Sequence, residues 1–319
     1  MSRKKQNADV NEFWTLARSF LKVYLPEARE VSGNTVMAYR QALEALIKYL
    51  EASGLSRDTM TIGALTATRI EGFMVWMSKD RGLKPRTCNL RLSAVKAFLR
   101  YCSRHMIVNE SVYRQVLELP MKKVRKEKIE YMSSEAMAAV MDAPDSTRVI
   151  GRRNRTMLAM LYDSAARVQE LVDVKVGDLH IAGRSITDSE AFVTLHGKGG
   201  KVRNVNLSPK TALLIQAYLR EFHPEGNRNV PLFYTRRAGL LWPLSVDSVS
   251  RVLKESADKA RNCSCDIPDR IHCHLVRKSR AMHLYIAGVP LPAIMELLGH
   301  VSMDTTSGLY ALEESKSYA

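Results

Sequence analysis

Apolar side chains recur every three or four residues through most of the first hundred positions. The clearest run covers residues 34–50, where the recurring positions are Val36, Tyr39, Leu43, Leu46, Ile47 and Leu50. Because a helix of about 3.6 residues per turn gathers such positions on one face, the run predicts an amphipathic helix, with Ser32 or Asn34 able to cap its start. Similar spacing predicts helices over 66–79 and 87–105. The N-terminal part is therefore predicted to be helical.

The helical pattern stops at residues 119–132, LPMKKVRKEKIEYM. Five of these fourteen residues are basic, one is proline, and the apolar side chains are scattered. Such a composition is typical of a linker between domains, and a basic linker can also lie along a phosphate backbone. We therefore expect a helical domain over 1–118, a basic linker over 119–132 and a second domain over 133–319.

The second domain combines alternating and helical patterns. Segments 191–197 (AFVTLHG) and 202–207 (VRNVNL) are β-like and are separated by KGGK, where glycine can supply positive φ at a hairpin turn. Residues 174–181 (VKVGDLHI) form a third β-like segment. Helical spacing covers much of the rest, over 134–141, 150–164, 208–222, 245–262, 271–287 and 290–298. The predicted fold class is mainly α with a small antiparallel β-sheet, with a helical N-terminal domain followed by a mixed α+β domain.

Basic residues exceed acidic residues by a wide margin. The chain has 48 Lys and Arg against 33 Asp and Glu, which gives a formal net charge of +15 and a pI near 9.7. This excess favours a polyanionic partner, most commonly nucleic acid, although a merely basic surface has the same count. No apolar run reaches membrane-spanning length, and no apolar stretch of a secretory signal follows the charged N-terminus. We therefore expect a globular, cytoplasmic protein.

Three of the five cysteines lie close to two histidines. The cluster consists of Cys263, Cys265, His272, Cys273 and His274. Its spacing does not match the usual C-x₂₋₄-C zinc knuckle, and an odd number of cysteines in a reducing compartment argues against a disulfide framework. Reduced, partly buried thiols are the better interpretation, and we expect no bound metal.

The segment HLVRKSRAMH, which begins at His274, has five basic or imidazole side chains and no acidic one. At about 100° per residue, His274, Arg277 and Lys278 fall within one arc of a helix. Arg280 and His283 point elsewhere and are expected to be solvated. The arc can present a guanidinium and an imidazole to one phosphodiester, because a guanidinium is always charged and can grip two oxygens. A solvated, charged helix face is the alternative.

Four other segments contain residues of matching chemistry. SAARVQELV has Arg167 at the start of a short helix and Glu170 one turn later, which can hold a catalytic guanidinium in one rotamer or form a plain intrahelical ion pair. HGKGGKVR has Lys198 at a hairpin tip, where an ammonium can give up a proton. LGH ends a helix at His300, and TTSGLYAL contains Tyr310 shortly afterwards.

In this order and at these intervals, the segments resemble the tyrosine recombinase (phage integrase) family, which also includes the chromosome-dimer resolvases. The catalytic domain of that family shows R-x-x-E-L, a G-K-G hairpin, H-x-x-R, L-G-H and a tyrosine nine or ten residues later. The matches here are ARVQEL, HGKGG, HLVR, LLGH and TTSGLY. Each is weak alone, but five in order are specific. The chain departs from the family at Ala166, where Gly is usual, and at Lys278, where His is frequent.

The resemblance implies how DNA would be cut. Tyr310 would attack a DNA phosphate to give a 3′-phosphotyrosyl link and a free 5′-hydroxyl, with Tyr318 the other tyrosine nearby. Arg167 and Arg277 would clamp the non-bridging oxygens. This chemistry is sound on its own terms, because a tyrosine of pKa near 10 is roughly one part in a thousand phenolate at pH 7, and nearby guanidiniums favour the anion.

The resemblance also implies the proton transfers. Lys198 would protonate the leaving 5′-oxygen, His274 would act as general base or proton relay, and His300 would hydrogen-bond the phosphate. Attack on the link by a 5′-hydroxyl from another duplex then completes strand exchange, without metal, ATP or any other cofactor.

The implied partner is double-stranded DNA with a specific recombination site, bound by a homo-tetramer. The domain over 1–118 resembles the family's SAM-like core-binding domain. Predicted DNA contacts are the basic residues Arg86, Arg91, Lys96, Lys122, Lys123 and Arg125. The predicted function is site-specific recombination in the integration, excision or resolution of a mobile element or chromosome. Two alternatives are a DNA-binding factor with a decayed site and a type IB topoisomerase, which shares the cleavage chemistry but not strand exchange.

Overall fold

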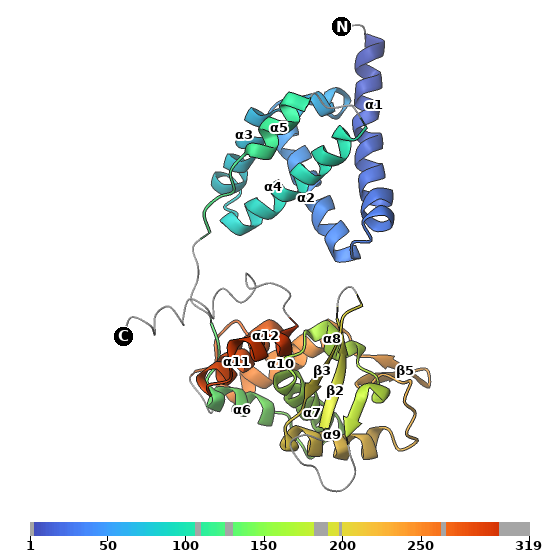
Figure 1. Cartoon of the computed structure of the whole chain (residues 1–319), viewed down its shortest axis with the longest axis vertical. Helices are drawn as coiled ribbons and strands as arrows, with labels where there is room; N and C mark the ends of the chain where they lie inside the picture. The colour runs from blue at the N-terminus through green and yellow to red at the C-terminus, as the bar shows by residue number, and fades with distance from the viewer. Residues whose placement is uncertain are drawn as a thin grey trace, which may run out of the picture. The chain divides into compact units, whose positions relative to one another are not determined.

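The computed structural model describes residues 3–105, 110–124, 130–181, 191–197, 200–262 and 266–299, without the side chains of 3–9 and 111–112. The chain divides into two compact units, Met1–Arg125 and Lys126–Ala319 (Figure 1). The division falls inside the basic segment 119–132.

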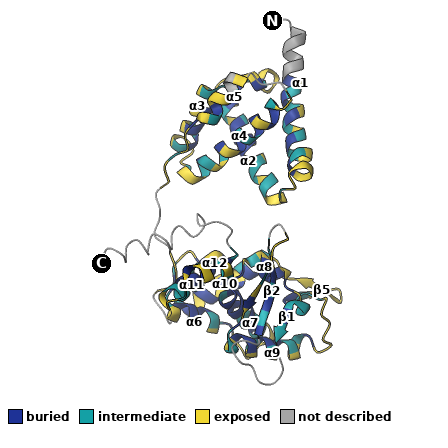
Figure 2. Ribbon diagram, in the orientation of Figure 1, coloured by how far each residue is buried: buried dark blue, intermediate teal, exposed yellow. Residues whose placement is uncertain are grey.

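The first unit is entirely helical in its described part. Its long helices are α1 (Arg3–Ser19), a π-helix η1 (Phe20–Ala28), α2 (Gly33–Ala52), α3 (Ala67–Lys79), α4 (Pro85–Ser103) and α5 (Glu110–Glu118), with the 3-10 turns η2 (Arg57–Thr59) and η3 (Ile62–Ala64) between α2 and α3. The apolar faces meet in one core, seen as the dark blue interior in Figure 2. Phe20 and Phe98 lie at its centre, with ring centroids 5.4 Å apart. Burial of these faces stabilises the helical unit, as expected from the three amphipathic helices predicted over 34–50, 66–79 and 87–105.

The second unit combines helices with two small antiparallel sheets. Its helices are α6 (Ser134–Asp142), α7 (Val149–Asp163), α8 (Val168–Asp173), α9 (Pro209–Phe222), α10 (Val246–Ala260), α11 (Cys273–Ile286) and α12 (Leu291–Leu298). One sheet has the order β1 (Leu179–Ile181), β2 (Ala191–His196), β3 (Val202–Asn206), and the other pairs β4 (Tyr234–Arg237) with β5 (Leu240–Pro243). The predicted fold class is confirmed.

The larger sheet buries one face against the helices. Along β2, Ala191, Val193 and Leu195 are buried and alternate with more exposed residues. Opposite residues of paired strands share a face, and Leu195 lies opposite Arg203 of β3. A basic side chain therefore projects from the apolar face of this sheet. Helix α7 is buried along most of its length and packs against α9 and α11.

Two details differ from the sequence predictions. The strand expected over 174–181 begins only at Leu179, because Val176–Asp178 forms a 3-10 turn in which the backbone N–H of Lys175 donates to Asp178 Oδ2 at 2.8 Å. The β4–β5 hairpin was not predicted, since Arg236 and Arg237 precede its turn and interrupt any apolar alternation. In the described part of the chain, no helix is long and apolar enough to cross a membrane.

Candidate active site

Arg167 stands at the N-cap of the short helix α8. Its backbone N–H donates to Glu170 Oε2 at 2.8 Å, and its Nη1 donates to Glu170 Oε1 at 2.7 Å. The carboxylate of Glu170 is buried, whereas 45% of the Arg167 side chain is exposed. The predicted Arg–Glu pair therefore exists, and it fixes the guanidinium while leaving part of it open to a ligand.

Arg277 lies on α11 and is almost completely buried. Its Nη1 donates to the carbonyl oxygen of Ala165 at 2.6 Å, and its Nη2 donates to the carbonyl oxygen of Leu298 at the end of α12. Ala165 is a non-glycine residue in the left-handed region, with φ of 46°. This strained turn between α7 and α8 directs its carbonyl at Arg277 and brings α11 next to the segment that contains Arg167.

Burial and neighbouring positive charges lower the pKa values of two residues in this region. Burial, and then the neighbouring positive charge of Arg167, lowers the pKa of Arg277 to about 9. The guanidinium stays protonated at neutral pH, and the shift reflects chiefly its removal from water and then the positive charge of its neighbours. Desolvation lowers the pKa of His274 as well, assisted by the charges of Lys278 and Arg277. A neutral imidazole at this position can accept a proton.

The buried carboxylate of Glu170 pairs with two guanidiniums, those of Arg167 and of Arg203 on β3. Burial opposes its ionisation, but hydrogen bonds from Arg203, and then from Arg167, outweigh burial and hold its pKa at about 2. Arg203 was missed by the sequence analysis. Its position opposite the buried Leu195 on an otherwise apolar face was the available signal, because a basic residue on an inward face needs a buried partner.

Three predicted site residues, Lys198, His300 and Tyr310, lie outside the described residues. The glycines that precede the first two are described. An added Cβ at Gly197 would lie 3.4 Å from Glu170 Oε1, and one at Gly299 would lie 3.1 Å from Arg203 Nη1. The chain thus enters both segments beside the Glu170–Arg203 pair.

The predictions for Arg280 and His283 were wrong. Arg280 pairs with the buried carboxylate of Asp163 at 3.0 Å, and its guanidinium lies over the ring of Tyr162. His283 contacts the Tyr162 hydroxyl through Nδ1 at 2.7 Å and the carbonyl of Met132 through Nε2 at 2.8 Å. The far side of α11 packs against α7 and residue 132, so these side chains stabilise the fold rather than face solvent.

The predicted DNA contacts differ in their surroundings. Arg86 and Lys123 are exposed, and Arg91 is half-buried. The ammonium of Lys96 donates to the carbonyl oxygens of Leu117 and Leu119, both at 2.7 Å, at the end of α5. Lys122 donates through Nζ to Ser78 and through its backbone to Asn89. Arg125 lies outside the described residues. Lys96 and Lys122 thus have internal partners.

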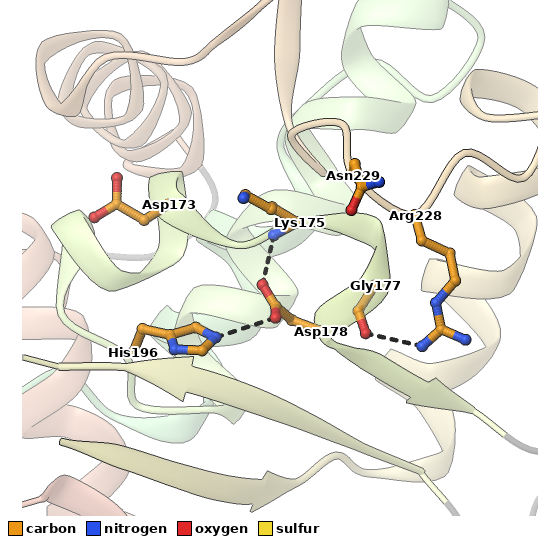
Figure 3. A pocket seen from close by; sticks show the side chains of 7 residues that line it. All are labelled: Asp173, Lys175, Gly177, Asp178, His196, Arg228 and Asn229. Carbon is orange, nitrogen blue, oxygen red and sulfur yellow. Dashed lines mark hydrogen bonds and ion pairs between the residues drawn. The ribbon is translucent and has the colours of Figure 1, made fainter. Parts of the chain in front are cut away.

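A hollow of about 550 Å³ lies beside η4 and the end of β2 (Figure 3). Asp178 stands in it, with Oδ1 at 3.1 Å from His196 Nε2, and Arg228 donates to the Gly177 carbonyl at 3.1 Å. Two carboxylates balance the lysine and arginine here, so this hollow lacks the positive excess found around Arg277. Among the described residues, no three His, Cys, Asp or Glu side chains gather as metal ligands. Cys263 and Cys265 lie outside them.

Two family models match the chain. The one described as the phage integrase family matches residues 130–316, and the one described as the phage integrase N-terminal SAM-like domain matches residues 19–105. A putative integrase/recombinase y4rC of Sinorhizobium fredii is 27% identical over 91% of this chain and 85% of its own. Tyrosine recombinase XerC of Bacillus pumilus is 27% identical over 89% of this chain and 87% of its own.

Solved structures share the fold at lower identity. XerH site-specific recombinase bound to a palindromic difH substrate, in a post-cleavage complex, has a TM-score of 0.67 at 20% identity, covering 98% of this chain and 89% of its own. A lambda integrase tetramer bound to a Holliday junction has a TM-score of 0.65 at 16% identity, covering 91% of this chain and 77% of its own.

Proposed function

The chain belongs to the phage integrase family and is a tyrosine-type site-specific DNA recombinase, and from that premise we propose how its own residues cut and rejoin DNA. The phenolic oxygen of Tyr310 attacks the scissile phosphorus. The bond from phosphorus to the 5′-oxygen breaks, and the 3′-phosphate remains on the tyrosine. Attack on this link by a 5′-hydroxyl of a second duplex reverses the step and joins the exchanged strands.

Arg167 and Arg277 neutralise the phosphate in this proposal. The single observation that carries it is the convergence of their two segments, 112 positions apart, where Arg277 donates to the carbonyl of Ala165 two residues before Arg167. In the described part of the chain, Glu170 is the one carboxylate that acts on both guanidiniums, so balancing their two positive charges takes one further negative charge. A phosphodiester supplies that charge, and its transition state gains most because its oxygens become more negative.

Two protons must move for the phosphodiester bond to exchange. Tyr310 loses one, and His274 can accept it because the pKa of its imidazole is lowered by desolvation and neighbouring cations. The leaving 5′-oxygen gains one, which we assign to Lys198. His300 donates a hydrogen bond to the phosphate. Both residues follow glycines that lie beside Glu170 and Arg203, which supports their place in one site.

The helical unit would grip the duplex while the second unit cuts it. We propose DNA-backbone contacts for the exposed Arg86 and Lys123, for Arg91, and for Arg125 of the basic segment 119–132. Four copies on paired recombination sites, each donating one Tyr310, would complete an exchange, and this would take place where the DNA lies, in the cytoplasm. A decayed binding factor would lack cleavage, and a type IB topoisomerase would relax DNA without joining two duplexes.

Covalent trapping on a nicked duplex tests the proposal. The duplex is enriched by binding from a randomised pool, and its nick lies close to the cleaved phosphate, so that the short product diffuses away and the link persists. We expect wild type and Tyr318→Phe to form the link, and Tyr310→Phe to bind the duplex equally well without forming it. Trapping by Tyr310→Phe would overturn the assignment, and joining of two labelled duplexes separates recombination from topoisomerase activity.

A further inference from the structure

Arg203 of β3 has a partner for each nitrogen of its guanidinium. Nη1 donates to Glu170 Oε1 at 3.0 Å, and Nη2 donates to Glu170 Oε2 at 2.7 Å, which makes a bidentate pair. Nε donates to the carbonyl oxygen of Leu297 near the end of α12 at 3.0 Å. Only 14% of the side chain is exposed. One planar group therefore joins β3, α8 and α12, and its geometry leaves little freedom to any of them.

Glu170 links Arg203 to Arg167 through hydrogen bonds. Its two oxygens accept the two bonds from Arg203 and two more from the backbone N–H and Nη1 of Arg167, at 2.8 and 2.7 Å. Four bonds use the usual acceptor capacity of a carboxylate. The carboxylate cannot turn without breaking several of them, so Arg203 fixes the carboxylate that in turn fixes Arg167.

The charges around Glu170 give Arg203 a second role. With Arg167 alone, the carboxylate would cancel the charge that the phosphate needs. With Arg203 also paired to it, the three guanidiniums of Arg167, Arg203 and Arg277 face one carboxylate among the described residues, and these four groups together have a net charge of about +2. Arg203 thus leaves the charge of Arg167 available to the substrate.

The end of α12 is fitted to the same guanidinium. Gly299 has φ of 59°, and an added Cβ would lie 3.1 Å from Nη1 and 3.3 Å from Cδ and Cζ of Arg203. The Leu298 carbonyl just before it accepts from Arg277. The backbone that leads to His300 is therefore seated between Arg203 and Arg277.

We propose that Arg203 is a positioning residue for DNA cleavage, which holds Arg167 through Glu170 and keeps the Arg167 charge free for the scissile phosphate. This inference rests on the proposed roles of Arg167 and Tyr310. The inference predicts that loss of Arg203 lowers the cleavage rate mainly when the scissile phosphate is negatively charged. Replacing one non-bridging oxygen of the scissile phosphate by a methyl group removes that negative charge, so a variant with a misplaced Arg167 should lose less on the methylphosphonate.

The experiment compares single-turnover rates of covalent complex formation on the phosphodiester and on the methylphosphonate. Arg203→Ala should lower the rate on the phosphodiester by about 100-fold or more, the size expected for a lost electrostatic contact. The fold-decrease in rate on the methylphosphonate should be at least ten times smaller than on the phosphodiester. Arg203→Lys should restore part of the rate. Affinity for the duplex should change by less than about threefold, since Arg203 is mostly buried.

Arg152→Ala is the matched control, because Arg152 also makes a bidentate pair, with Glu221 at 2.8 and 2.6 Å, on α7 and α9. Its rates should stay near wild type on both substrates. Equal losses of Arg203→Ala on both substrates would show a structural role only and overturn the inference. If Arg203→Ala does not fold, the same comparison with Arg203→Lys decides. Tyr310→Phe, inactive on both substrates, distinguishes failure of this inference from failure of the proposed nucleophile.

Discussion

Replacing Gly299 by alanine should disturb the active site through a single methyl group. Gly299 has positive φ and lies against Arg203, so alanine adds backbone strain and a contact. Gly288, in the turn before α12, offers a matched control: its φ is 83°, and an added Cβ there meets nothing within 4 Å. The two substitutions share the strain but not the contact.

The magnitude follows from these two contributions. An alanine in the left-handed region is destabilised by about 1–2 kcal/mol, and this applies to both variants. At Gly299 the methyl group also lies 3.1 Å from Arg203 Nη1, closer than ordinary contact. Three hydrogen bonds hold that guanidinium, so it can yield only by weakening one of them, and a bond to a charged group contributes about 1.5–3 kcal/mol. A loss of this size in the transition state corresponds to a rate about 10- to 100-fold lower.

Urea unfolding and covalent trapping on the nicked duplex measure the two contributions separately. Both variants should unfold more easily than wild type, and only Gly299→Ala should also cleave at least tenfold more slowly than Gly288→Ala. Equal cleavage rates for the two variants would contradict this prediction, because the methyl contact with Arg203 would then have no effect on the site.

Two further predictions concern stability and DNA contact. Glu170 has its pKa lowered to about 2 in the folded chain from an ordinary 4.5, so its stabilising contribution is complete above about pH 4.5 and is lost as the pH falls toward 2. In urea unfolding, the difference in unfolding free energy between wild type and Glu170→Gln should shrink on acidification from pH 6 to 3, and a constant difference would contradict the ion pair. Lys96→Met should destabilise the chain by about 1–3 kcal/mol, because the Leu117 and Leu119 carbonyls lose their donor, while its affinity for DNA stays near that of wild type. Arg86→Ala should lower the affinity for DNA and leave the stability near that of wild type. If unfolding and gel-shift measurements show the opposite pattern, Lys96 and not Arg86 is the DNA contact.

Most of the predicted helices could be found because apolar residues recur at helical spacing along them. The run over 34–50 became α2, and the spacing near 274 became α11, since helical periodicity depends only on local sequence. The family was likewise predicted from five short segments and is confirmed by the family models. Both results rest on short local patterns, and the family assignment also rests on their order along the chain.

Contacts between distant segments could not be predicted in the same way. Arg203 pairs with Glu170, 33 positions earlier, and only its inward place in β3 signals this. Arg280 and His283 face α7 and Met132, because the turn angle of a helix says which residues share a face but not which faces are covered. Lys96 had the same charge as Arg86, yet the end of α5 occupies its ammonium.

The tyrosine to which the DNA becomes linked is the most direct evidence for or against the proposed mechanism. Trypsin cleaves after Lys316 and so separates Tyr318 from the peptide that contains both Tyr285 and Tyr310. Mass spectrometry of the trapped and digested complex should find a nucleotide adduct on this longer peptide, with fragmentation placing it at Tyr310. An adduct on Tyr318, on Tyr285 or on no tyrosine would contradict the mechanism.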